Sequence, residues 1–316
     1  MATSGSTSFK QTRNELIFDA LQIIGAYGIG RTVSGEDLKF CVSMLNKMIK
    51  AWAAKGLRLF TKEEAVLYVT PGQPNYLLGA GAKATLASDE VVTNLSAQIA
   101  ANETVLPLDL TLGMQVGDNI GIVLADKTIH WTTIQSIAGL NVTIALAAPV
   151  SVPEGSLVYT YTNTLTKPLR VLDARKRTIQ GQSSFDLPVT SVGYQDYQSF
   201  PVKYTGTGPT QFSFIPKTTH SEIHLWPAPV DANERIMLTI ERVVEDLNAT
   251  SDDFDLPPEW LEPVTYQLAL RLARPFGKAS AINDILPLAE SMYQNLLDYD
   301  AEVSSIQFYP EVGGYC

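Results

Sequence analysis

Cysteine is scarce in this sequence, with Cys41 and Cys316 the only two among 316 residues. Two cysteines supply neither a disulfide framework nor a cysteine-based zinc site. Histidine is nearly as rare, at positions 130, 220 and 224. The pair His220 and His224 has a spacing that suits a metal on a helix, but this segment predicts a strand and lacks the H-E-x-x-H pattern. We therefore expect no metal site.

Long apolar runs are also missing. No stretch approaches the roughly 20 residues of a membrane span, and the Ser/Thr-rich segment 1–11 lacks the apolar region of a secretory signal. Only 18% of residues are charged, and the 33 acids exceed the 23 bases, which gives a net charge of −10. Binding to a phosphate backbone needs clustered Lys and Arg, so this balance disfavours a nucleic-acid binder. We expect a soluble protein of a reducing compartment that does not bind membranes.

Recognisable catalytic signals are absent as well. No G-x-S-x-G, Walker or kinase motif occurs, so we predict no catalytic and no cofactor-binding residues. The glycines at 25, 28 and 30 follow a predicted helix, whereas a phosphate loop must follow a strand, and they are interpreted as a helix end. Cys41 lies in an apolar stripe and is predicted to be a buried core thiol.

Charged residues gather in two places. One basic cluster consists of Arg170, Arg175, Lys176 and Arg177. A nucleic-acid patch is one interpretation of it, but a solvated strand edge or a contact with an acidic partner fits the net charge better. The acids Glu245, Asp246, Asp252 and Asp253 are predicted to form a solvated linker.

Both ends of the chain show helical periodicity. Helices are predicted over 12–27, where Thr12 and Glu15 have the spacing of a capping box, and over about 35–54, opened by Ser34. A short glycine loop joins these two helices, so we expect an antiparallel pair. Two more helices are predicted, one opening at Pro257 and one over about 283–303.

Between the helical ends the apolar period changes to two, which indicates strands. They are expected at 65–70, 104–106, 120–124, 129–134, 142–146, 169–174, 211–215, 222–226 and 236–240. Short strands at regular spacing with turn signals over 85–161 are typical of a small barrel or sandwich.

The fold class that follows is α+β: a helical bundle made from both chain ends, with a long all-β insertion. Residues 1–60 and 250–316 form the predicted helical core, 61–86 and 160–249 a β domain, and 87–159 a small barrel-like module. Neither helical pair can bury its apolar stripe alone, so we predict one shared core. Its members are Leu16, Leu21, Leu45, Trp52, Leu268 and Leu272.

The same helical ends resemble a known family. Segments 12–25, 38–56, 258–273 and 286–299 resemble the head-to-tail adaptors of short-tailed bacteriophages, also called tail accessory factors or packaged-DNA-stabilisation, head-completion proteins. Residues 225–242 resemble β regions of larger phage versions, and 104–159 resemble modules inserted in virion proteins. The chain differs from the short adaptors by this β insertion and by its brief tail.

The resemblance implies a non-enzymatic structural protein without cofactors, located in the virion at the head–tail interface and in the host cytoplasm during assembly. It implies a ring of twelve copies beneath the portal protein, in contact with tail hub, nozzle or tail fibre proteins. Genomic DNA would pass through this ring without sequence-specific binding. An acidic conduit fits that role, because repulsion prevents stable phosphate contacts.

Two alternatives and one tail assignment stay open. A peptidoglycan-degrading virion enzyme would need a carboxylate pair in a cleft. A sugar-binding β-module protein would show Trp131, Tyr194, Tyr197 and Trp226 on one face. The tail after residue 304 either folds back on its own subunit or docks on the portal or a neighbouring subunit. Its anchors would be Ile306, Phe308, Tyr309 and Tyr315.

Overall fold

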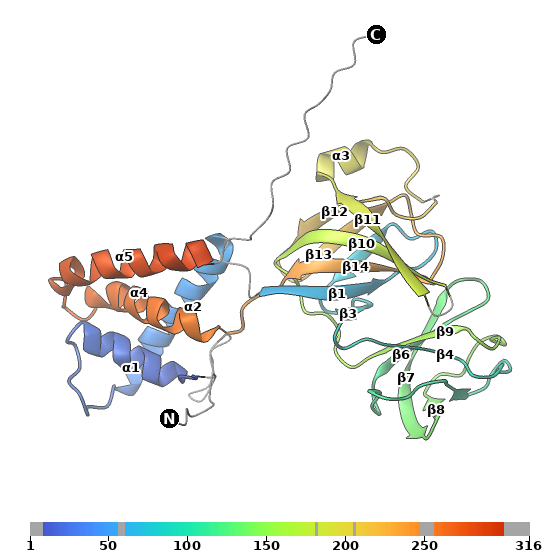
Figure 1. The fold of residues 1–316 in the computed structure, drawn as a ribbon, viewed down its shortest axis with the longest axis horizontal. Coiled ribbons are helices and arrows are strands. Elements are labelled where there is room, and N and C mark those ends of the chain that lie inside the picture. Colours follow the sequence, from blue (N-terminus) through green and yellow to red (C-terminus); the bar gives the residue numbers. More distant parts are fainter. Residues whose placement is uncertain (1–8, 56–60, 181–182, 205–206, 247–255, 300–316) are drawn as a thin grey trace, which may run out of the picture. The chain divides into compact units, whose positions relative to one another are not determined.

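The structure is a computed structural model that describes residues 9–55, 61–180, 183–204, 207–246 and 256–299. It divides into two compact units, one formed by 1–60 with 244–316 and one formed by 61–243. The fold is mixed α+β and strands dominate it, as Figure 1 shows. The α+β class predicted from the sequence is therefore confirmed.

The first unit is helical. Its elements are α1 (Arg13–Ile23), α2 (Gly35–Lys55), a short 3-10 helix η2 (Pro258–Trp260), α4 (Leu261–Ala273) and α5 (Ala281–Tyr299). The predicted capping box is confirmed, because the Thr12 hydroxyl accepts from the Glu15 amide and the Glu15 carboxylate accepts from the Thr12 amide. Helix α1 therefore begins where the sequence indicated.

Gly25 ends α1 through its backbone conformation. Its φ of 67° lies in the left-handed region that favours glycine. The Gly25 amide donates to the Gln22 carbonyl (2.8 Å) and the Ala26 amide donates to the Leu21 carbonyl (3.0 Å). These two bonds satisfy carbonyls that a helix end otherwise leaves unpaired, so the helix stops at Ile23, four residues before the predicted end.

One apolar core joins the helices of this unit. Residues of α1, α2, α4 and α5 belong to a single cluster of buried side chains. Helix α1 packs mainly against α4, and its contact with α2 is smaller, so its neighbour in sequence is not its main neighbour in space. The cluster includes all six residues assigned to the helical core from the sequence, namely Leu16, Leu21, Leu45, Trp52, Leu268 and Leu272.

The second unit contains an eight-stranded sheet. Its strand order is β2-β13-β12-β11-β10-β14-β1-β3, and only the short β11–β12 pairing is parallel. Every strand contributes to one buried cluster on one face of the sheet. The strands are β1 (Lys62–Tyr68), β2 (Asn75–Leu78), β3 (Ala84–Leu86), β10 (Arg170–Gln180), β11 (Ser183–Ser191), β12 (Gln211–Pro216), β13 (Ser221–Trp226) and β14 (Glu234–Glu241).

The same unit holds a six-stranded antiparallel sheet in the order β4-β9-β6-β7-β8-β5. Its end strands approach each other through a bridge between Leu95 and Leu108, which closes the sheet into a small barrel around its own apolar core. The predicted module boundary at residue 159 falls inside β9. The strands are β4 (Val91–Asn94), β5 (Val105–Pro107), β6 (Asn119–Val123), β7 (Ile129–Ala138), β8 (Asn141–Ile144) and β9 (Leu157–Tyr161).

A third cluster links the barrel to the eight-stranded sheet. The ring of Tyr68 from β1 stacks on Tyr161 (5.6 Å between centroids) and lies 5.2 Å from Tyr159, both on β9. Met237 from β14 and Val123 from β6 belong to the same cluster. The barrel is therefore packed against the sheet through buried aromatic rings.

Several elements were not predicted. Strands β2, β3, β4, β9 and β11 and the short helix α3 (Tyr194–Ser199) are absent from the sequence-based assignment. Strand β9 is buried at all five positions, so it lacks the alternation of polar and apolar residues by which strands are recognised.

Candidate functional site

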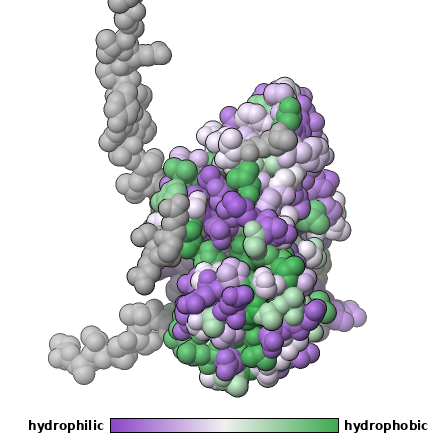
Figure 2. Space-filling view, turned by 90° about the vertical axis from the view of Figure 1, so that its right-hand side faces the viewer, coloured by the Kyte–Doolittle hydropathy of each residue, from purple (hydrophilic) through white to green (hydrophobic). Residues whose placement is uncertain are grey.

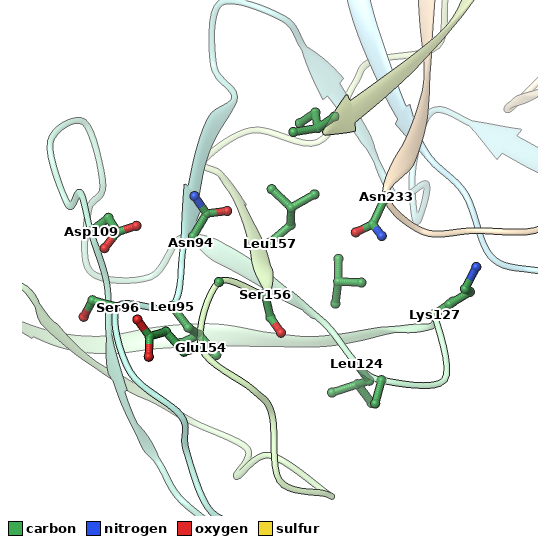
Figure 3. A pocket seen from close by; sticks show the side chains of 14 residues that line it. Asn94, Leu95, Ser96, Asp109, Leu124, Lys127, Glu154, Ser156, Leu157 and Asn233 are labelled. Carbon is green, nitrogen blue, oxygen red and sulfur yellow. The ribbon is translucent and has the colours of Figure 1, made fainter. Parts of the chain in front are cut away.

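The β unit has a cleft of about 650 Å³ at the barrel, a size typical of ligand sites. Figure 3 shows Asp109, Ser96 and Glu154 on one side of the view and Lys127 and Asn233 on the other. The loops and strand ends that carry the lining come mainly from the barrel. The full lining is Asn94, Leu95, Ser96, Asp109, Val123, Leu124, Ala125, Lys127, Glu154, Gly155, Ser156, Leu157, Ile179 and Asn233.

Most polar side chains of this cleft make no hydrogen bond with another described residue. Among the described residues, six of them have no hydrogen-bond partner for the side chain, namely Asn94, Ser96, Asp109, Glu154, Ser156 and Asn233. Lys127 differs, because its ammonium group lies 2.9 Å from the Asp231 carboxylate. The cleft thus offers amides, hydroxyls and carboxylates to a ligand, while its lysine is already neutralised.

Sequence reasoning missed this cleft. Its lining residues come from segments that lie far apart in the chain, and none belongs to a motif. Asp109 and Glu154 supply the two carboxylates that an enzyme hypothesis requires, and both are exposed. A carboxyl group that acts as an acid catalyst is usually held in a desolvated setting, so their exposure does not favour catalysis.

Acidic residues of the same chain pair with the basic cluster. The Arg177 guanidinium group donates two hydrogen bonds to the Asp186 carboxylate, at 2.7 and 2.8 Å. Arg175 pairs with Glu64 and also lies 3.9 Å from Asp186. These partners come from β1 and β11, so strand pairing brings them to β10.

The other two members of the basic cluster have acidic neighbours as well. Lys176 lies 3.0 Å from Glu234, and both side chains are nearly buried. Arg170 lies 4.0 Å from Glu241. All four cations of this cluster therefore lie beside carboxylates of the same chain.

A second polar group surrounds His224. The Nε2 atom of His220 lies 3.5 Å from one carboxylate oxygen of Glu222, and the Nε2 atom of His224 lies 3.5 Å from the other. The Lys217 ammonium group also contacts this carboxylate. The expectation that His220 and His224 both lie on the strand is wrong for His220, because β13 begins at Ser221.

Helix α3 covers His224. The rings of Tyr197 and Tyr194 lie 5.1 and 5.8 Å from the imidazole ring. The Nδ1 atom of His224 lies 2.5 Å from the side-chain oxygen of Asn75 on β2. Burial lowers the pKa of His224 below its ordinary value, and the Glu222 carboxylate partly opposes this shift.

The aromatic face predicted for a sugar-binding protein is only partly present. Tyr197 is buried, and the Trp226 ring packs on Phe200 at 4.6 Å, so these rings serve the packing of α3. Trp131 belongs to the cluster at the barrel, where its ring lies 5.0 Å from Tyr68. The four rings do not share one exposed face, because only Tyr194 is exposed.

The structure also bears on individual sequence predictions. Cys41 is buried, and burial raises the pKa of its thiol to about 11, as expected for a core cysteine. Asp246 of the predicted linker pairs with Lys50 at 2.9 Å.

Other predicted residues lie outside the described part of the chain, namely Asp252, Asp253, Ile306, Phe308, Tyr309, Tyr315 and Cys316.

Exposed apolar side chains occur on the barrel. Figure 2 shows hydrophobic and hydrophilic residues mixed on the face of the molecule that it displays. The Thr111 hydroxyl donates to the Gly139 carbonyl (3.0 Å), and the Leu108 amide donates to the Leu140 carbonyl (2.9 Å), so the two loops are adjacent. Their apolar members Leu110, Leu112 and Leu140 are 45, 80 and 54% exposed.

Within the described ranges, no group of three or more His, Cys, Asp or Glu side chains is arranged to hold a metal ion. No helix in this part of the chain is long and apolar enough to cross a membrane.

Comparison with known proteins gives little guidance. No protein-family profile matches the chain, and no curated protein matches it. Among solved structures, VP17, a capsid protein of bacteriophage P23-77, is 11% identical over 60% of this chain and 77% of its own, with a TM-score of 0.12. The complex of the two major capsid proteins VP16 and VP17 of the same phage is also 11% identical, over 57% of this chain and 82% of its own, with a TM-score of 0.12. Likeness at this TM-score does not define a shared fold.

Proposed function

We propose that this protein is a structural virion protein of a bacteriophage: a ring-forming head-to-tail adaptor that joins portal and tail and closes the head after DNA packaging. The observation that carries the proposal is the single helical core, in which Leu16 and Trp52 from one chain end share a cluster with Leu268 from the other. The resemblance to adaptors lies in these same helices. The proposed partners are the portal protein and tail hub, nozzle or tail fibre proteins, and the β unit adds further surface that such proteins can bind.

The charge distribution supports a channel that DNA passes through. The net charge of the chain is −10. Acids of the same chain neutralise its basic cluster, as the Arg177–Asp186 contact illustrates. An acidic channel lining would repel phosphate and so let DNA slide without binding.

Exposed apolar surface supports assembly with other proteins. Leu110, Leu112 and Leu140 are exposed on adjacent loops of the barrel, and contact with another protein would remove these apolar side chains from water. No catalytic, cofactor or metal role is part of this proposal.

Ring formation is tested with the purified chain and the portal protein encoded in the same genome. Mass photometry and negative-stain microscopy of the mixture should show a complex with twelve copies of this chain on the portal ring. A chain that stays monomeric and does not bind the portal contradicts the adaptor function.

The tail is the proposed contact with the portal or a neighbouring subunit, through Ile306, Phe308, Tyr309 and Tyr315. Truncation after Val303 should leave the melting temperature unchanged and abolish portal binding. A truncated chain that melts much lower and still binds the portal would assign these residues to the core of their own subunit.

One observation keeps the enzyme alternative testable. Asp109 and Glu154 place two carboxylates in the same cleft. If the protein degrades peptidoglycan, purified chain should solubilise cell-wall glycan and Glu154→Gln should abolish the activity. We expect no cleavage by either form.

A further inference from the structure

The cleft at the barrel presents both hydrogen-bond donors and acceptors. Asn94 and Asn233 each present an amide that donates and accepts, Ser96 and Ser156 present hydroxyls that do both, and the carboxylates of Asp109 and Glu154 only accept. None of the six side chains has a hydrogen-bond partner among the described residues. Most charged side chains of the β unit, by contrast, are paired.

We propose that this cleft binds a neutral oligosaccharide. Each sugar hydroxyl both donates and accepts, which matches a lining of amides, hydroxyls and carboxylates. The apolar side chains of Val123, Leu124, Leu157 and Ile179 complete the lining, and they suit the C–H face of a sugar ring. This binding activity is separate from the adaptor function and does not rest on it.

Other ligand classes fit the lining less well. A phosphate or an acidic glycan would meet Asp109 and Glu154, while the ammonium group of Lys127 is already engaged by Asp231. A guanidinium or ammonium group is donor-only, so it would leave the amide donors of Asn94 and Asn233 without partners. A ligand that is neutral and rich in hydroxyls satisfies both kinds of group.

Backbone hydrogen bonds hold the rim in place. The Asp109 amide donates to the Asn94 carbonyl at 3.1 Å, and the Leu95 amide donates to the Ser156 carbonyl at 3.0 Å. On the other side, the Ala232 amide donates to the Lys127 carbonyl at 3.1 Å. A rim fixed in this way loses little conformational entropy when a ligand binds, which favours binding.

The experiment uses the full-length protein on an array of neutral and acidic bacterial glycans, followed by calorimetric titration of each neutral hit. Asp109→Ala and Asn233→Ala change opposite sides of the cleft, and Glu103→Ala is the control, because Glu103 is exposed on the same barrel and does not line the cleft. The side chains of Asp109 and Asn233 make no hydrogen bonds with other residues that the structure describes, so both variants should melt like wild type.

We expect neutral glycan hits whose affinity falls at least about tenfold in each cleft variant and stays unchanged in Glu103→Ala. Three outcomes overturn the proposal: no neutral glycan bound by wild type, neutral hits unaffected by the cleft variants, or hits confined to acidic glycans. Glycan binding and portal binding are measured separately, so failure of one is distinguishable from failure of the other.

Discussion

Arg235 and Glu90 form an ion pair inside the β unit, with side chains only 5 and 8% exposed. Arg235 lies on β14 of the eight-stranded sheet, and Glu90 directly precedes β4 of the barrel. The guanidinium group also lies 5.3 Å from the centre of the Tyr159 ring. The pair therefore links the two sheets at a site from which water is largely excluded.

Removing one partner of this pair should destabilise the β unit. Glu90→Gln leaves the Arg235 charge buried without compensation, which costs about 3–5 kcal/mol of unfolding free energy. Lys127→Met is the matched control, because the Lys127–Asp231 pair has a lysine that is 58% exposed, and exposed pairs contribute less than about 1 kcal/mol. Urea unfolding measures both. Equal midpoints for Glu90→Gln and wild type would show that the pair adds no net stability.

The stability of the β unit should fall as the pH drops below the ordinary pKa of histidine. Burial lowers the pKa of His224, so the folded ring stays neutral at a pH where the unfolded chain already gains a proton. Stability from the neutral ring is thus present above roughly pH 6.5 and lost as pH falls below it. Thermal unfolding of wild type, His224→Gln and the control His130→Gln at pH 7.5 and 5.5 measures this. Between pH 7.5 and 5.5 the melting temperature should fall less in His224→Gln than in wild type, and His130→Gln should behave like wild type. If His224→Gln loses as much as wild type, His224 is not the group responsible for the loss.

Gly208 should not tolerate a side chain. Its φ is +96°, and a Cβ atom there would lie 2.8 Å from the Lys176 ammonium nitrogen and 3.3 Å from a Glu234 oxygen. Gly208→Ala therefore combines backbone strain of about 1–3 kcal/mol with disruption of a nearly buried ion pair. Gly139→Ala is the control, because its φ is +62° and a Cβ atom would meet nothing within 4 Å. Denaturant midpoints should fall further for Gly208→Ala, and equal losses would mean that Lys176 moves aside freely.

Trp52 should be essential to the helical unit. It is 5% exposed, and its ring lies 5.1 Å from Tyr293 and 6.4 Å from Trp260. Trp52→Ala should cost about 3–5 kcal/mol through lost burial and the cavity that remains. Leu288→Ala is the control, since Leu288 is 44% exposed on α5. Far-UV circular dichroism during unfolding follows the helices, and a Trp52→Ala protein that melts like wild type would remove Trp52 from the core.

Local signals were the most reliable part of the sequence. The capping box of Thr12 and Glu15 depends on atoms a few residues apart, so it is visible without any tertiary information, whereas the end of α1 was placed four residues too late. Longer strands with alternating residues, such as β7, were found for the same reason. Strand β9 was missed because burial on both faces removes the alternation, although its two tyrosines join the barrel to the sheet.

The amino-acid sequence by itself determined the α+β class, the places where α1 and α2 begin, the core position of Cys41 and the net charge of −10. Only the tertiary structure decided which charged groups pair with each other. Arg177 forms an ion pair with Asp186, and Arg235 forms one with Glu90. Asp109 and Asn233 line the same cleft. These relationships depend on strand register and on the packing of one sheet against another, which bring together residues that are up to 145 positions apart (235 − 90 = 145). Local propensity and spacing carry no information about such pairs, because the free energy that selects them comes from burying the whole sheet at once.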